Sequence, residues 1–183
     1  AEGDHGDFTY ENRVRVRKMA GAEISYDGAN VQNQSRSAEV NGIAIEENKN
    51  REIIGGGAYT KAVSGEKNSS LYGGIQGESN AVATAEVGEG TLRQSKNSSY
   101  SGQVSNTDGN KKADLSIGGS KSTQLHSTTE NSERLEGRTQ EGGFSTNIAR
   151  GKDGATTGSV QGDISRSRDI SNITTKEDGS VQK

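Results

Sequence analysis

Large apolar side chains are scarce in this chain, and that scarcity limits what it can fold into more than any other feature. Leu, Ile, Val and Phe together number 28 of 183 residues, about 15%. A chain with less than roughly 20% of these residues usually buries too little apolar surface to offset its ordering entropy. A single conventional hydrophobic core is therefore not expected.

The charge balance and the lack of proline argue against simple disorder. Lys and Arg number 22, Asp and Glu number 25, the net charge is −3, and the sequence contains no Pro. Disordered segments usually combine low hydrophobicity with a high net charge and abundant Pro. We therefore expect ordered sheets whose backbone hydrogen bonding is repeated from one copy of the chain to the next.

Alternation of apolar and polar residues is the main secondary-structure signal. In the segment from Arg13 to Arg17, Val14 and Val16 lie on one side of an extended chain and the arginines, including Arg15, lie on the other. Similar alternation occurs at 22–26, 43–45, 81–87, 113–117 and 144–148. Period two with β-branched residues is typical of strands, here in runs of about four to seven residues.

Glycine-containing pairs between these runs indicate tight turns. Asp-Gly or Asn-Gly occurs at 27–28, 41–42, 108–109, 153–154 and 178–179, and glycine doublets or triplets occur at 55–57, 73–74, 118–119 and 142–143. Such pairs accept the positive φ of hairpin turns. The segment 127–138 lacks a helical apolar stripe and is interpreted as a turn or loop. The predicted fold class is all-β, many short strands forming a β-solenoid or a stacked, cross-β-like sheet in a polymer.

A degenerate internal repeat supports an elongated arrangement of the chain. Thr146-Asn147-Ile148 recurs 25 residues later as Ser171-Asn172-Ile173, and each copy is followed by Asp-Gly at the same distance. The sequence 158–161 likewise recurs at 179–182. A unit of roughly 25–30 residues fits one coil or one hairpin of a stacked β architecture. We expect an N-terminal strand or arm at 1–20 and a single elongated, repeat-like domain at 21–183.

The segment 146–160, TNIARGKDGATTGSV, resembles repeats in exported bacterial Gly/Asn/Ser-rich proteins. Some proteins of that kind form fibres, in the manner of the functional amyloids of biofilm matrices. The resemblance implies an extracellular fibre subunit whose partners are copies of itself and a matrix polysaccharide.

Chemistry-bearing motifs are missing from the sequence. It contains no Cys and two His, and it has no nucleophile elbow, Walker loop or zinc-protease motif. We therefore predict no enzyme activity and no cofactor. The interspersed charges give no nucleic-acid signal, and no apolar run approaches the roughly 20 residues of a membrane span. The start at Ala1 without Met fits a processed export precursor, so a secreted or cell-surface location is expected.

Two functions are consistent with these features. The first is the structural subunit of an extracellular filament, in which the segment containing Val14 and Val16 adds to the sheet of a neighbouring copy. Arg13, Arg15 and Arg17 would then meet acidic side chains of that neighbour, while the alternative for this segment is an ordinary edge strand of its own subunit. The second function is a self-contained β-solenoid that binds a ligand, such as a carbohydrate adhesin or an ice-binding surface. Candidate glycosylation sequons begin at Asn33, Asn68, Asn97 and Asn172.

Overall fold

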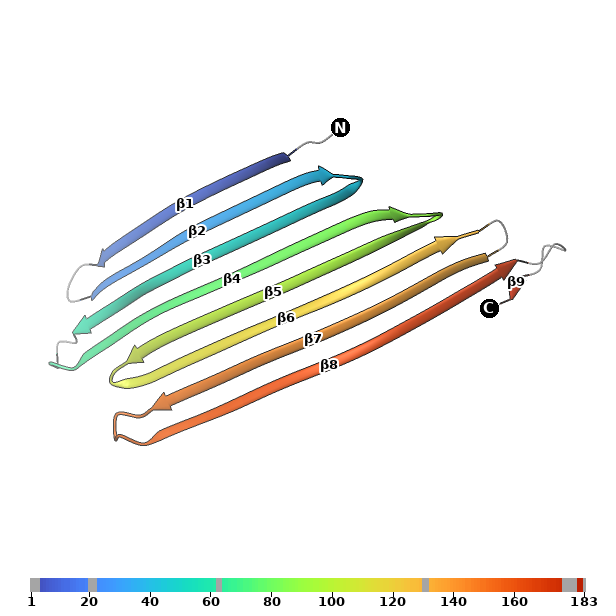
Figure 1. Cartoon of the computed structure of the whole chain (residues 1–183). Helices are drawn as coiled ribbons and strands as arrows, with labels where there is room; N and C mark the ends of the chain where they lie inside the picture. Colours follow the sequence, from blue (N-terminus) through green and yellow to red (C-terminus); the bar gives the residue numbers. More distant parts are fainter. Residues whose placement is uncertain (1–3, 20–22, 62–63, 130–131, 176–180, 183) are drawn as a thin grey trace.

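The protein forms one open antiparallel sheet with no second layer in the described residues (Figure 1). This computed structural model describes residues 4–19, 23–61, 64–129, 132–175 and 181–182, and its side chains are described over 6–16, 24–61, 64–129 and 132–174. The strands are β1 (Asp4–Met19), β2 (Glu23–Val40), β3 (Ile43–Lys61), β4 (Lys67–Val87), β5 (Gly90–Thr107), β6 (Asn110–Thr128), β7 (Ser132–Arg150), β8 (Thr156–Thr175) and β9 (Val181–Gln182).

Each strand pairs with its neighbour in the sequence, so the sheet is a simple meander from β1 to β9. Within the described strands, every paired register continues without a bulge. The two-residue β9 pairs only with Thr174 and Thr175 at the end of β8. In the described part of the sheet, the outer edge of β1 and nearly all of the outer edge of β8 therefore have no strand beside them.

The predicted Asn-Gly and Asp-Gly turns connect several of these strands. Asn41 and Gly42 have φ of 53° and 76°, and Asp108 and Gly109 have φ of 51° and 87°. Two successive residues with positive φ are typical of a type I′ hairpin, whose twist matches that of the flanking strands. Gly154, in the β7–β8 connection, also has positive φ. The Asp178-Gly179 pair lies outside the described residues.

The all-β prediction is confirmed, but the strands are 16–21 residues long in β1 to β8, far longer than the runs we expected. The glycines at 28, 55–57, 73–74, 118–119 and 142–143 lie inside strands. Gly28, for example, pairs with Val14 on one side and Gly55 on the other. Polar side chains alternate between the two faces of a strand as apolar ones do. The strand pairing therefore continues through stretches that look like loops in the sequence. The expected loop at 127–138 is shorter for the same reason, since β7 begins at Ser132.

The sheet has no hydrophobic core among the described residues. Val14 and Val16 are each 70% exposed, and Ile164 is 85% exposed. Three described residues are buried, and all three are glycines beneath tyrosine rings: Gly56 beneath Tyr72, Gly57 beneath Tyr26 and Gly77 beneath Tyr100. Ring-over-glycine packing of this kind lets a bulky side chain cover bare backbone in a sheet. It is the closest approach to a core that this single layer makes.

Candidate functional site

The candidate site is the whole sheet, because its two faces differ in chemistry. Side chains alternate between faces along a strand, and paired residues on adjacent strands share a face. The observed registers therefore place the even-numbered residues of β1, β2, β5, β7 and β8 on one face with the odd-numbered residues of β3, β4 and β6. We call this the apolar–basic face and the opposite one the acidic face.

Large apolar side chains gather on the apolar–basic face. It carries twenty-five of the Leu, Ile, Val, Phe and Tyr residues whose side chains are described. The acidic face carries six, namely Val31, Ile54, Tyr72, Val82, Leu135 and Ile173. Isolated exposed apolar residues are normal in soluble proteins, whereas a contiguous patch marks an interaction surface. The apolar–basic face therefore has the character of an interaction surface.

Charge is divided between the faces as sharply as hydrophobicity. The apolar–basic face carries thirteen described cations, Arg36, Lys49, Arg51, Lys61, Lys67, Lys96, Lys111, Lys121, Arg134, Arg138, Arg150, Arg166 and Arg168. Its described acids are Glu47 and Glu136. The acidic face carries thirteen described acids, Asp7, Glu11, Asp27, Glu39, Glu46, Glu52, Glu78, Glu86, Asp114, Glu133, Glu141, Asp163 and Asp169. Its described Lys and Arg residues are Arg13, Arg15, Arg93 and Lys112. The net charge of the chain is thus near neutral because the opposite charges of its two faces nearly cancel.

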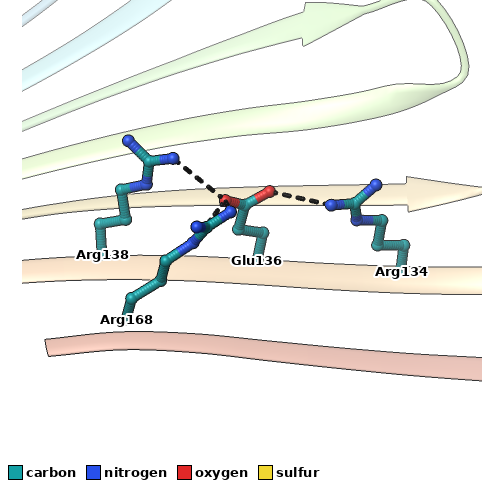
Figure 2. Close-up of polar contacts among 4 residues, drawn as sticks. All are labelled: Arg134, Glu136, Arg138 and Arg168. Atoms are coloured by element: carbon teal, nitrogen blue, oxygen red, sulfur yellow. Dashed lines mark hydrogen bonds and ion pairs between the residues drawn. The ribbon is translucent and has the colours of Figure 1, made fainter.

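An ion cluster on the apolar–basic face is centred on Glu136 (Figure 2). Arg168 places Nη2 at 2.8 Å and Nε at 3.2 Å from Glu136 Oε1, and Arg134 and Arg138 approach within 3.3 Å and 3.5 Å of the same carboxylate. The hydrogen bond from Arg168, with the charges of all three arginines, lowers the pKa of Glu136. Because Arg138 and Arg168 are directly opposite each other on β7 and β8, the carboxylate offsets a like-charge pair.

Polar side chains on the acidic face form cross-strand ladders. Gln76 donates to Glu52 at 2.9 Å, and Asn97 donates both to Glu78 at 3.1 Å and to Asn80. Near the end of the sheet, His126 and Glu133 approach to 2.6 Å. Such amide and carboxylate ladders hold neighbouring strands in register on a face that few apolar contacts stabilise.

The structure shows on which face of the sheet the residues of the predicted contact segment lie. Val14 and Val16 lie on the apolar–basic face, and Arg13 and Arg15 lie on the acidic face. The side chain of Arg17 lies outside the described residues. The whole of β1 pairs with β2 of its own chain, and Arg15 is opposite Asp27. The segment therefore forms the edge strand of its own sheet, and its role in contacts between copies remains a prediction.

The registers also assign the sequons and the repeat copies to one face or the other. Asn33, Asn68 and Asn97 lie on the acidic face, while Asn172 lies on the apolar–basic face. The repeat copies at 146–148 and 171–173 occupy opposite faces, because Asn147 lies on the acidic one. The two copies are therefore not equivalent positions of one repeating unit in this sheet. The repeated stretch at 179–182 lies mostly outside the described residues.

Within the residues that the structure describes, no group of three or more His, Asp or Glu side chains is arranged to hold a metal ion. In the same part of the chain, no helix is long and apolar enough to cross a membrane.

The partition of charge between the two faces was not predicted from the sequence. The signal was present in adjacent pairs of opposite sign, such as Arg51-Glu52 and Arg168-Asp169, whose side chains must point to opposite faces of any strand.

Comparison with known proteins does not assign a family. No family model matches the chain, and no curated protein matches it. Among solved structures, the ferric yersiniabactin uptake receptor FyuA from Yersinia pestis is similar with a TM-score of 0.44 and 10% sequence identity. The similarity covers 82% of this chain and 25% of the receptor chain. At that TM-score and identity it carries no argument about function.

Proposed function

We propose that this protein is the structural subunit of an extracellular self-assembling filament and that it performs no catalysis. The observation that carries the proposal is a sheet with two open edges and no core of its own among the described residues. Large apolar side chains such as Phe8, Val160 and Ile164 are between 63% and 85% exposed. A sheet in this condition gains stability chiefly by pairing its edges and covering its faces with other chains.

The directions of the edge strands support a head-to-tail joint between copies. The described part of the chain contains eight long strands that alternate in direction, so β1 and β8 run antiparallel. When copies are placed side by side with the same orientation, β8 of one copy lies beside β1 of the next as an antiparallel pair. The meander then continues without interruption, and because the joint is heterologous it does not close by itself. The open edge of β1 is also where the segment containing Val14 and Val16 would add to a neighbour.

Electron microscopy of negatively stained protein tests the proposal most directly, alongside circular dichroism over a range of concentrations. We expect filaments, and a β-type spectrum that grows with protein concentration because the sheet depends on its neighbours. A variant with Pro at both Val160 and Gly162 should lose the filaments, since the backbone N–H groups of these residues lie on the open side of β8, away from β7, and Pro cannot donate to a ladder. A cooperatively folded monomer at micromolar concentration would contradict the proposal.

A further inference from the structure

The division of charge between the two faces makes the sheet complementary to itself. The apolar–basic face of one copy and the acidic face of another carry opposite charges over the same outline. We propose that sheets stack face to back, with the apolar–basic face of each copy covered by the acidic face of the next. This inference rests on the proposed filament function and adds the way in which its sheets laminate.

Adjacent residues of opposite charge show how the charges match in such a stack. In Arg51-Glu52 and Arg168-Asp169 the arginine lies on the apolar–basic face and the acid on the acidic face. Glu133-Arg134 has the same arrangement. When a second copy is translated along the sheet normal, its acid arrives over the arginine of the copy below, offset by one residue or about 3.4 Å. Each pair then becomes a column of alternating charge through the stack.

Cations outside these pairs also meet acids in the same placement. Lys121 is paired in register with Gln140, and the next residue on β7, Glu141, lies on the acidic face. In a translated copy, Glu141 is therefore about one strand and one residue away from Lys121, within reach of a lysine side chain across the roughly 10 Å between stacked sheets. Arg36 stands in the same relation to Glu46, because Arg36 is paired with Glu47.

The few apolar residues on the acidic face meet apolar partners in this placement. Gly28, Gly55 and Gly73 form a row without side chains on the apolar–basic face. Ile54 and Tyr72 project from the acidic face next to Gly55 and Gly73, so in a translated copy they lie over this bare row. Beside it is a concavity of about 520 Å³ that includes Leu71, Val104 and Ile148 among its lining residues. Leu135 in turn arrives beside Leu125 and Ile170, which flank its in-register neighbours.

The size of the face is sufficient for a stable contact. Eight strands about 4.8 Å apart and about 18 residues long give a face of roughly 38 Å by 60 Å, well above the area that a specific interface needs. An anionic lipid surface would satisfy the apolar–basic face alone and leave the acidic face unmatched. A second copy satisfies both, and translation repeated without closure produces an open-ended stack.

Charge-reversal variants and X-ray diffraction from assembled protein test the stack. Wild type should give an interstrand reflection at about 4.8 Å and an intersheet reflection at about 10 Å. The variant Arg51→Glu with Lys121→Glu should lose the intersheet reflection and keep the interstrand one, and so should Glu52→Lys with Glu141→Lys. Lys121 lies opposite Lys96, so its reversal removes a like-charge contact within the sheet and does not weaken it. Mixing the two variants should restore the intersheet reflection, because each then presents the charge that the other needs.

The matched control is Arg93→Glu with Lys112→Glu, which makes the same change in net charge on the acidic face and should keep the intersheet reflection. Loss of that reflection in the control, its persistence in the first two variants, or failure of the mixture to recover it would overturn the stacking model. So would binding of wild-type monomer to vesicles containing phosphatidylserine without any intersheet reflection. Filaments that give only the interstrand reflection would overturn face-to-back stacking and leave the filament proposal intact. A wild-type protein that sediments as a monomer, with neither filaments nor salt-sensitive oligomers, would overturn both.

Discussion

The ring of Tyr100 on β5 lies directly over Gly77, its paired residue on β4, and occupies the space that a Cβ atom at position 77 would take. Gly77 is buried as a result, although it lies in the middle of a one-layer sheet. The same relationship links Tyr26 to Gly57 and Tyr72 to Gly56. These three pairs, on β2 to β5, contain all three of the buried residues among those described.

Replacing Gly77 with Val should therefore destabilise the sheet although Val is the better strand former. The new side chain must displace the Tyr100 ring, and overpacking of this kind costs about 1–3 kcal/mol. Gly137 provides the matched control, since a Cβ there meets nothing within 4 Å, and Gly137→Val should be neutral or stabilising by up to about 1 kcal/mol. Urea denaturation of the assembled protein measures both, and an equal response of the two variants would contradict the ring-over-glycine account.

The stability of the sheet should depend on the ionisation of Glu136. Its hydrogen bond from Arg168 and the neighbouring guanidinium charges lower its pKa below the ordinary 4.5. A carboxyl with a depressed folded-state pKa contributes stability that is present above its unfolded pKa and is lost as the pH falls through the folded value. Wild type should therefore lose stability as the pH falls below 4.5, and Glu136→Gln should remove this part of the dependence. A pH profile of Glu136→Gln that matched that of wild type would contradict this account.

The β5–β6 turn should depend on Asp108 through two contacts. Its carboxylate accepts a hydrogen bond of 2.7 Å from the backbone N–H of Ser69, and its own N–H donates to the Ser69 carbonyl at 2.9 Å. Asp108 also has positive φ, which Asn tolerates and Ala does not. Asp108→Ala should cost about 1–2 kcal/mol in denaturation measurements, whereas Asp108→Asn should cost much less. An equal loss in both variants would show that the charge, and neither turn geometry nor hydrogen bonding, is what stabilises the turn.

The sequence predicts local strands better than it predicts their extent or their partners. The alternation of Val14 and Val16 with Arg13 and Arg15 identifies the two sides of β1 correctly, and Asn41-Gly42 identifies a real hairpin. Asp27-Gly28 has the same turn chemistry but lies within β2, because Gly28 is held between Val14 on β1 and Gly55 on β3. A local pattern contains no information about such cross-strand partners.

The two-faced character of the sheet depends on connection lengths as much as on composition. Odd-numbered residues of β3 share a face with even-numbered residues of β2, since the two-residue turn at Asn41 and Gly42 pairs Val40 with Ile43. One residue more or fewer in any connection would move a whole strand's side chains to the other face. Alternation within each strand can thus be predicted from the sequence, but the summed charge of each face cannot be predicted without the register.

The final prediction concerns the joint between copies. Whether the two edge strands of a copy run antiparallel or parallel depends on whether it has an even or an odd number of long strands. Removal of residues 1–20 takes away β1 and leaves β2 and β8 as the edges, which run in the same direction. A head-to-tail joint would then be parallel, its hydrogen bonds slanted and slightly weaker, and the edge that β1 offered would be gone. Removal of residues 1–42 takes away β1 and β2 together and restores antiparallel edges on β3 and β8. We expect electron microscopy to show loss of filaments in the first variant and partial recovery in the shorter second one. General destabilisation cannot explain a recovery of filaments on further shortening, so such a recovery would identify strand direction at the joint as the cause. Filaments of normal width and stability in the first variant would exclude a joint between β8 and β1.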